Sequence, residues 1–268
     1  MIKLIAIDLD GTLLNENSAI TRESIETINK AMDEGVRIVL CSGRPMSGLY
    51  PYIKELGLDE DEEYIISQNG SKISTANNEI IKEILMEEAD VNYLVDLADK
   101  EDVGVCIISG SDNYYAYNYS TPAMEHDADL VFLDVEVLDR DLSKMENNDP
   151  MVVMAVDEKD KLDRFTDKYE AEISKQFEFV RSCSTILEFL NRGIGKGPAL
   201  LYLADYLNLD ISEVMVIGDE LNDLSMFEID AFKVAMGNAH QDIKDRADYI
   251  TLANSEDGVA HAIKKFVL

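Results

Sequence analysis

Short apolar runs alternate with amphipathic stretches near the N-terminus of the chain. Three of these runs are too short for helices and have the continuous apolar character of strands buried on both faces; they occupy residues 2–7, 36–41 and 64–67. The stretches between them, residues 21–34 and 45–56, predict helices, the first with a threonine cap and the second with a leading proline. This order of strands and helices is typical of a doubly wound parallel sheet.

The same alternation returns after Gly193. Strands are predicted at residues 214–217 and 231–235, and helices at 198–208, 221–228 and 257–266. The two ends of the chain therefore predict one α/β core with a Rossmann-like, doubly wound parallel sheet.

The middle of the chain has more strands than helices. Helices are expected at residues 91–100 and 159–173, and strands at 103–109, 114–119, 151–157, 177–181 and 185–190. This pattern predicts a smaller inserted α/β domain with an antiparallel sheet. The expected domains are a discontinuous core of residues 1–83 and 189–268 and an insert of residues 84–188. Three alternating tyrosines of the insert are expected on one face of a strand: Tyr115, Tyr117 and Tyr119. They have two interpretations, packing in the core of the insert or lining a substrate pocket.

Composition narrows the possible partners. The chain has 268 residues, enough for two domains, with 46% hydrophobic and 29% charged residues and a formal net charge of −30. Such an acidic chain is not expected to bind nucleic acid or an anionic membrane, since both require a basic surface. A small anionic substrate is still possible, because a local cation reverses the field at one site.

The cysteines and the N-terminus indicate a cytoplasmic, reduced protein. The three cysteines form no CxxC pair, so neither a disulfide framework nor a zinc site is indicated: Cys41, Cys106 and Cys183. Two aspartates interrupt the first apolar run, and no run approaches the 18 or so apolar residues of a membrane helix. The acidic run at residues 60–63 is expected to be a solvated loop.

Polar side chains follow four of the predicted core strands. They are Asp8 and Asp10, Ser42 and Gly43, Asn69 and Gly70, and Asp219 and Asp223. The carboxyl ends of parallel strands meet at one edge of the sheet, where ligands bind in open α/β folds. Two carboxylates about 4 Å apart repel by roughly 4 kcal/mol at an effective dielectric constant of 20, so this cluster requires a cation. Oxygen ligands without histidine or cysteine favour magnesium.

Each of these motifs taken alone also has a structural explanation. Aspartate and glycine after a strand are a turn signal, and Asp219 and Ser42 are both suitable helix N-caps. Lys196 lies at the start of a predicted helix, where its positive charge is unfavourable next to the positive end of the helix dipole. A phosphate bound between the ammonium and the helix N-terminus would interact favourably with both. Its surroundings match neither a P-loop nor a dinucleotide fingerprint. A cysteine-phosphatase loop at Cys41 is excluded, because Ser47 stands where that loop needs arginine.

The ordered set of motifs resembles a known family. The motifs are DLDGT at residues 8–12, SGR at 42–44, NG at 69–70, GKG at 195–197, GDELND at 218–223 and AMGNA at 235–239. With them the chain resembles the haloacid dehalogenase superfamily, and within it the Cof-type phosphatases with a C2B cap. Gly195 departs mildly from a serine that is frequent at that place in the family.

The resemblance implies a role for each matched residue. Asp8 would be the nucleophile that forms an aspartyl-phosphate, and Asp10 the acid and base. Magnesium would be held by the Asp8 carboxylate, the Asp10 backbone carbonyl and Asp219, with Asp223 as support. The implied phosphate contacts are the amides of Leu9 and Gly43 and the side chains of Ser42, Lys196 and Asn222. Residues 84–188 would be the cap that selects the substrate.

Three functions fit these expectations. The first is a magnesium-dependent phosphomonoester hydrolase acting on small phosphorylated metabolites such as sugar phosphates. The second is a phosphomutase or phosphotransferase that uses the same aspartyl-phosphate. The third is a phosphometabolite-binding module without turnover, although such a protein would usually have lost Asp8, Asp10 or Lys196. The sequence indicates neither the physiological substrate nor the oligomeric state.

Overall fold

The computed structural model describes residues 1–58 and 63–268, so most of the acidic run expected to be a solvated loop lies outside the described residues. The chain forms two compact units. The core unit consists of Met1–Gly43, Tyr50–Lys82 and Gly195–Leu268, and the inserted unit of Arg44–Leu49 and Glu83–Ile194.

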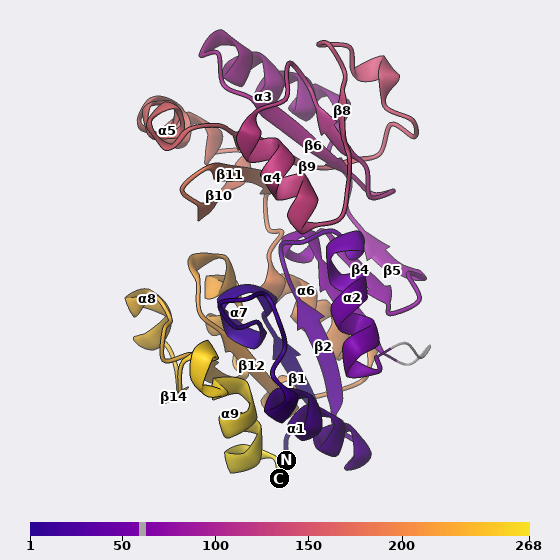
Figure 1. Ribbon diagram of the computed structural model, residues 1–268, viewed down its shortest axis with the longest axis vertical. Helices are drawn as coiled ribbons and strands as arrows, with labels where there is room; N and C mark the ends of the chain where they lie inside the picture. The colour runs from indigo at the N-terminus through magenta and orange to yellow at the C-terminus, as the bar shows by residue number, and fades with distance from the viewer. Residues whose placement is uncertain (59–62) are drawn as a thin grey trace. The chain divides into compact units, whose positions relative to one another are not determined.

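An eight-stranded sheet forms the centre of the core unit (Figure 1). Its strands are, in sheet order, β14 (Tyr249–Ile250), β13 (Phe232–Ala235), β12 (Val214–Gly218), β1 (Leu4–Ile7), β2 (Arg37–Cys41), β3 (Tyr64–Ser67), β4 (Lys72–Thr75) and β5 (Ile80–Glu83). The pairs from β14 to β3 are all parallel, and β4 adds to β3 in the antiparallel direction. The predicted doubly wound parallel sheet is confirmed, and two further strands that were not predicted, β4 and β5, extend it beyond β3.

Helices cover both faces of this sheet. They are α1 (Arg22–Asp33), α2 (Met46–Leu56), α6 (Lys196–Tyr206), α7 (Leu224–Phe227), α8 (Gln241–Lys244) and α9 (Gly258–Phe266). The first turn of α2, up to Leu49, is counted with the inserted unit. Helix α1 packs against α9, and α6 packs against α7. From β1 the chain crosses to β2 through α1, and from β12 it crosses in the opposite direction to β13 through α7. Right-handed crossovers in opposite directions place α1 and α7 on opposite faces of the sheet.

The inserted unit has its own six-stranded sheet (Figure 1). Its strands are, in sheet order, β10 (Phe177–Cys183), β11 (Ile186–Asn191), β9 (Pro150–Val156), β6 (Val105–Ser109), β7 (Tyr114–Ala116) and β8 (Val135–Val137). The pairs are antiparallel apart from β7 and β8, which are parallel. The predicted antiparallel sheet of the insert is therefore correct for all pairs but that one.

Helices pack on both faces of this second sheet. Helices α3 (Glu88–Lys100) and α5 (Lys159–Ile173) contribute to a core that includes Val105 and Ile107, whereas α4 (Pro122–Leu130) packs with their strand neighbours Cys106 and Ile108. This alternation is the two-residue period of a strand buried on both sides. Helix α4 was not predicted, although its start has a Thr121 cap followed directly by proline, a recognisable helix signal.

Two of the three alternating tyrosines pack in the core of the insert, which was the first of the two interpretations, and the third is held by a hydrogen bond. Tyr115 is buried in the core beneath α3 and α5, and its hydroxyl accepts a hydrogen bond from the Glu146 amide at 3.1 Å. Tyr117 packs against the same core, and the Tyr119 hydroxyl donates to the Asp102 carbonyl at 2.8 Å.

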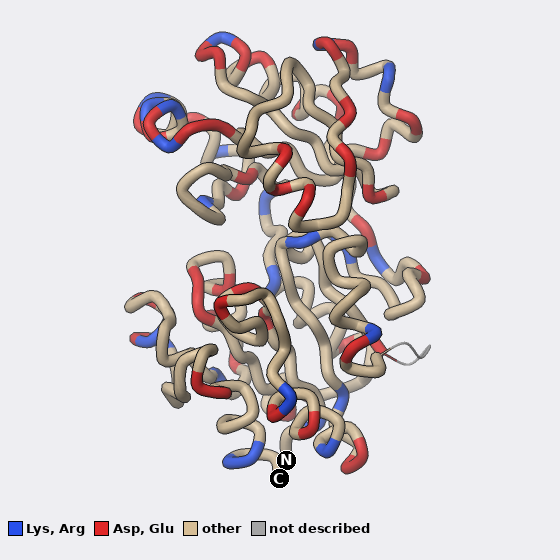
Figure 2. Tube along the Cα trace, viewed as in Figure 1, with Lys and Arg blue, Asp and Glu red and all other residues tan. Residues whose placement is uncertain are grey.

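Acidic residues are spread over the helices and loops of both units, with Lys and Arg interspersed (Figure 2). Among the described residues, no helix is both long and apolar enough to span a membrane.

Candidate active site

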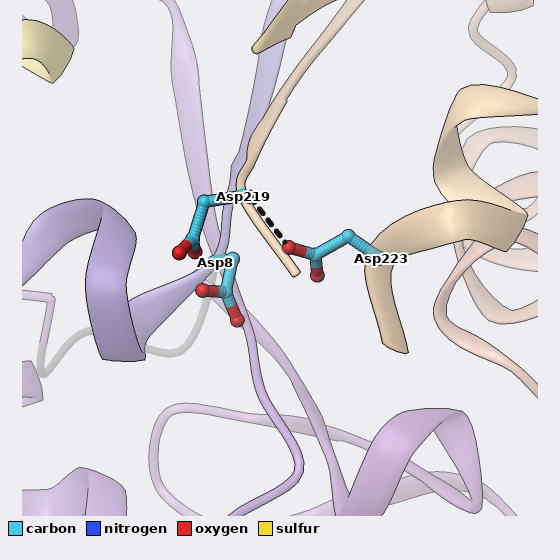
Figure 3. Close-up of side chains that lie close together, drawn as sticks. All are labelled: Asp8, Asp219 and Asp223. Atoms are coloured by element: carbon cyan, nitrogen blue, oxygen red, sulfur yellow. Dashed lines mark hydrogen bonds between the residues drawn. The ribbon is translucent and has the colours of Figure 1, made fainter. Parts of the chain in front are cut away.

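Two aspartates lie side by side at the carboxyl ends of neighbouring strands. Asp8 follows β1 and Asp219 follows β12, and the Asp8 amide continues the ladder by donating to the Ile217 carbonyl at 3.0 Å. Asp223 reaches the same point from the turn after β12 (Figure 3). One carboxylate oxygen from each of these three buried aspartates lies within 4.8 Å of the others.

Asp223 is directed back onto the strand end by two backbone hydrogen bonds. Its Oδ2 accepts from the amide of Asp219 at 2.9 Å and from that of Glu220 at 3.3 Å. Gly218 makes room for this carboxylate, because a Cβ there would lie 2.5 Å from Asp223 Oδ2. The chain therefore returns to the end of β12 four residues after it leaves the strand. Asp219 is not the helix cap that its position also permits, since Glu220 caps the turn instead.

Lys196 is enclosed by this cluster. Its Nζ lies 2.6 Å from Asp8 Oδ1 and 2.6 Å from Asp223 Oδ1, and its side chain has no exposed surface. The N-terminus of α6 holds the lysine at this depth, because Gly197 sits against the Ser225 carbonyl where no side chain fits. The Gly197 amide also donates to Ser225 Oγ at 3.0 Å, which fastens the start of α6 to α7.

Burial and like charges perturb the ionisation of these groups. Burial is the largest cause that raises the pKa of Asp8 well above its ordinary value, and Asp223 adds to it while Lys196 opposes it. Burial and the neighbouring Asp223 raise the pKa of Asp219 to about 7, against the lowering effect of the Thr12 hydroxyl. Burial alone would lower the pKa of Lys196, but Asp223 and Asp8 raise it above the usual range, so the ammonium stays charged.

The donor set fits a hard divalent cation. Three carboxylates face one ammonium, which leaves two negative charges uncompensated when all are ionised. The donors are carboxylate oxygens, the ligand type that Mg²⁺ prefers. Asp8 and Asp219 are the members of the cluster that would hold the ion, while Asp223 is occupied by Lys196 and two amides.

A second group of polar residues is linked to the ends of β2 and β3. The Asn69 amide donates to the Ser42 carbonyl at 3.0 Å, and Asn222 Nδ2 donates to Asn69 Oδ1 at 3.3 Å. A Cβ at Gly43 would lie 3.0 Å from Asn69 Nδ2, so any larger residue there would have to displace the Asn69 side chain slightly. Ser42, Gly43 and Asn222, which the resemblance implies as phosphate contacts, are thus connected through Asn69.

The turn Leu9–Leu13 carries the remaining predicted residues. Gly11 allows this turn with a φ of 80°, and Asp219 occupies the space where a side chain would stand. Asp10 lies exposed in the turn, and its carboxylate is not a member of the three-aspartate cluster. Leu9 is buried. The structure thus brings Asp8, Lys196, Asp219 and Asp223 into one cluster, whereas Asp10 lies exposed in the turn that follows Asp8.

The excluded cysteine nucleophile lies behind the cluster. Cys41 is fully buried at the end of β2, and burial raises the pKa of its thiol above the usual range. A thiol in that state is a poor nucleophile.

Two contributors to the site were not identified from the sequence. Thr12 donates its hydroxyl to Asp219 Oδ1 at 2.7 Å, and Asn238 Nδ2 donates to Asp219 Oδ2 at 3.2 Å. Both residues lie within motifs quoted for the resemblance, and that membership was the only available signal.

Comparison with known proteins identifies the family. Residues 5–263 match the model of the haloacid dehalogenase-like hydrolases. The protein YxeH of Bacillus subtilis strain 168 is 35% identical over 280 residues, covering 100% of this chain and 99% of that protein. The 5-amino-6-(5-phospho-D-ribitylamino)uracil phosphatase YcsE of the same organism is 32% identical over 267 residues, with coverages of 100% and 96%.

Solved structures agree with this result. The crystal structure of a haloacid dehalogenase-like hydrolase from Bacteroides thetaiotaomicron superposes with a TM-score of 0.89 at 32% identity, covering 99% of each chain. The family model and these relatives extend over both the core and the insert. The chain therefore belongs to the haloacid dehalogenase-like hydrolases and is an enzyme of that family.

Proposed function

We propose that this enzyme is a magnesium-dependent phosphatase that hydrolyses phosphomonoesters of small metabolites through an aspartyl-phosphate at Asp8. The observation that carries the proposal is the buried ammonium of Lys196, held 2.6 Å from both Asp8 and Asp223 beside a third carboxylate. A cluster with this excess of negative charge is costly for the fold alone, because buried carboxylates without a full set of counter-charges destabilise it. Its arrangement suits a reaction that brings a phosphate and a divalent cation together.

In the first step, a carboxylate oxygen of Asp8 attacks the phosphorus atom, and the bond between phosphorus and the ester oxygen breaks. Asp10 donates its proton to the leaving oxygen. Lys196 keeps Asp8 in place through Oδ1 and opposes the rise in the pKa of Asp8 that burial causes. When bound, Mg²⁺ would supply positive charge next to the transferred phosphoryl group.

In the second step, Asp10 takes a proton from water, and the water oxygen attacks the phosphorus atom of the aspartyl-phosphate. The bond from phosphorus to Asp8 breaks, which releases inorganic phosphate and restores the Asp8 carboxylate. The exposed position of Asp10 suits a group that exchanges protons with both the leaving group and water.

The residues that would hold Mg²⁺ are the Asp8 carboxylate, the Asp10 backbone carbonyl and Asp219, with Asp223 supporting them. The phosphate oxygens would be bound by the amides of Leu9 and Gly43, and by the side chains of Ser42, Lys196 and Asn222. Lysine and oriented backbone amides are common phosphate ligands.

The proposed substrates are small phosphorylated metabolites such as sugar phosphates. The relative YcsE is named as a phosphatase of 5-amino-6-(5-phospho-D-ribitylamino)uracil, which is a small phosphorylated metabolite. We propose that residues 84–188 act as the cap and select among such substrates, because the reacting groups proposed above all belong to the core unit.

The test is phosphate release from a panel of phosphorylated metabolites and an aryl phosphate, with Mg²⁺ and with EDTA. We expect release that depends on Mg²⁺ and that is lost in Asp8→Asn, whose carboxamide is nearly isosteric but is not a nucleophile. Circular dichroism of Asp8→Asn serves as the control for folding. Full activity in Asp8→Asn would contradict the proposed intermediate, and isomerised sugar phosphates without free phosphate would indicate a mutase.

A further inference from the structure

The loop between β13 and α8 wraps around the end of β12. Within it, the Met236 amide donates to the Gly218 carbonyl at 3.1 Å, and the His240 amide donates to the Asp219 carbonyl at 2.8 Å. Residues 236–240 therefore support the backbone on both sides of the point where Asp219 leaves the strand. The proposed mechanism gives this loop no role.

Asn238, in the middle of the loop, contacts two parts of the site with one amide group. Its Nδ2 donates to the Gly11 carbonyl at 2.8 Å and to Asp219 Oδ2 at 3.2 Å. Its Oδ1 accepts from the Asn254 amide at 3.0 Å. Because a backbone N–H can only donate, this contact orients the side chain with its NH₂ toward the Gly11 carbonyl and the Asp219 carboxylate.

Asn254 extends the connection to the far end of the same turn. Its Nδ2 donates to the Leu14 carbonyl at 2.8 Å, directly after the turn Leu9–Leu13. The two asparagines thus join the segment that carries Asp8 and Asp10 to the carboxylate at the end of β12.

Both carboxylate oxygens of Asp219 accept hydrogen bonds from side chains of the protein. Thr12 donates to Oδ1 and Asn238 donates to Oδ2, so the plane of the carboxylate is defined before any ligand binds. Each oxygen keeps a lone pair for a cation, since a carboxylate has about four acceptor positions. Hydrogen bonds of this kind orient metal ligands, and their removal weakens metal binding by about 10- to 100-fold.

We propose that Asn238 is a positioning residue for magnesium: it orients the Asp219 carboxylate and fixes the Gly11 carbonyl beside it. The inference rests on the proposed Mg²⁺ site. Its direct consequence is a change in metal affinity, whereas substrate affinity at saturating Mg²⁺ stays the same, because Asn238 is not among the proposed phosphate contacts.

The experiment is a calorimetric titration of MgCl₂ into metal-free protein without substrate. The variants are Asn238→Ala and Asn238→Ser, and the matched control is Asn147→Ala. Asn147 also makes a side-chain hydrogen bond, to Ser111 at 2.9 Å, but both of these residues belong to the inserted unit. We expect the Kd for Mg²⁺ to rise about 10- to 100-fold in both Asn238 variants and to stay unchanged in Asn147→Ala. Phosphate release should show an unchanged KM and a rescue of kcat by excess Mg²⁺.

A Kd within twofold of wild type in either folded Asn238 variant would overturn the inference, as would an equal rise in Asn147→Ala. If wild-type protein binds Mg²⁺ but releases no phosphate from any substrate, the proposed function fails while the titration still decides the role of Asn238. If wild-type protein binds no Mg²⁺, the inference is wrong.

Discussion

Replacement of Lys196 by methionine tests the buried charge cluster most directly. Methionine keeps much of the length and the apolar stem of lysine but removes its charge, so Asp8 and Asp223 both lose a partner at 2.6 Å. At an effective dielectric constant of 20, each of these contacts corresponds to about 6 kcal/mol of Coulomb attraction, and much of it offsets the desolvation of the ammonium. Removing one partner of a buried ion pair costs about 3–5 kcal/mol of folding free energy.

We therefore expect Lys196→Met to lower the free energy of unfolding by about 3–5 kcal/mol at pH 8 in EDTA. The loss should be smaller at pH 5, because without Lys196 the pKa of Asp8 rises further and the carboxyl becomes neutral by protonation. Urea denaturation followed by circular dichroism measures both values. With Mg²⁺ and substrate, kcat should fall about 10²- to 10³-fold, the usual effect of removing one group that stabilises transition-state charge.

Lys30→Met is the control, since Lys30 is an exposed lysine of α1 in the same unit. It should change the free energy of unfolding by less than about 0.5 kcal/mol. An equally small change in Lys196→Met at pH 8 would refute the account of the cluster. Activity retained within threefold would refute the proposed role of Lys196 in phosphate binding.

Two further predictions concern Asp219 and the turn beside it. The pKa of Asp219 is raised from an ordinary value of 3.8 to about 7, so between these pH values the folded metal-free protein retains a proton that the unfolded chain has lost. The free energy of unfolding in EDTA should therefore fall as the pH rises from about 4 to about 7. If Asp219→Asn showed the same dependence of unfolding free energy on pH, this account would be contradicted. Gly11→Ala should weaken Mg²⁺ binding at least tenfold, because the added Cβ would meet Asp219. Gly35→Ala is the control, since Gly35 has a similar φ of 86° but no atom near the place of a Cβ. It should cost only about 1–2 kcal/mol of backbone strain and leave the calorimetric Mg²⁺ affinity unchanged.

Continuous apolar runs made the central strands predictable, and the unpredicted elements lack such runs. Strand β5 lies at the edge of the sheet and has no buried residue, and β14 has two residues. Neither segment has the apolar continuity that identifies a strand covered on both faces, so hydrophobic pattern does not reveal them. Their pairing depends on neighbours that only the folded sheet provides.

The charged part of the site was predictable for a different reason. Asp8 and Asp219 stand directly after core strands, so topology assigns both to one edge of the sheet. Lys196 follows the insert instead of a core strand, so only the resemblance to the family pointed to its place in the site. Asn238 has no such marker, because an asparagine in a loop has no spacing that indicates its target. Its two acceptors, Gly11 and Asp219, are defined only by the path of residues 236–240 around β12.

The division of the chain explains why the chemistry is easier to infer than the substrate. The catalytic, metal-binding and phosphate-binding residues proposed here belong to the core unit, although the inserted unit separates Asp8 from Lys196 and Asp219 in the chain. The pairing of β1 with β12 brings these segments together whatever sequence lies between them, because parallel strands require only a crossover connection. We therefore expect changes in the insert to leave the charge cluster intact, as the proposed division between a catalytic core and a substrate-selecting cap requires.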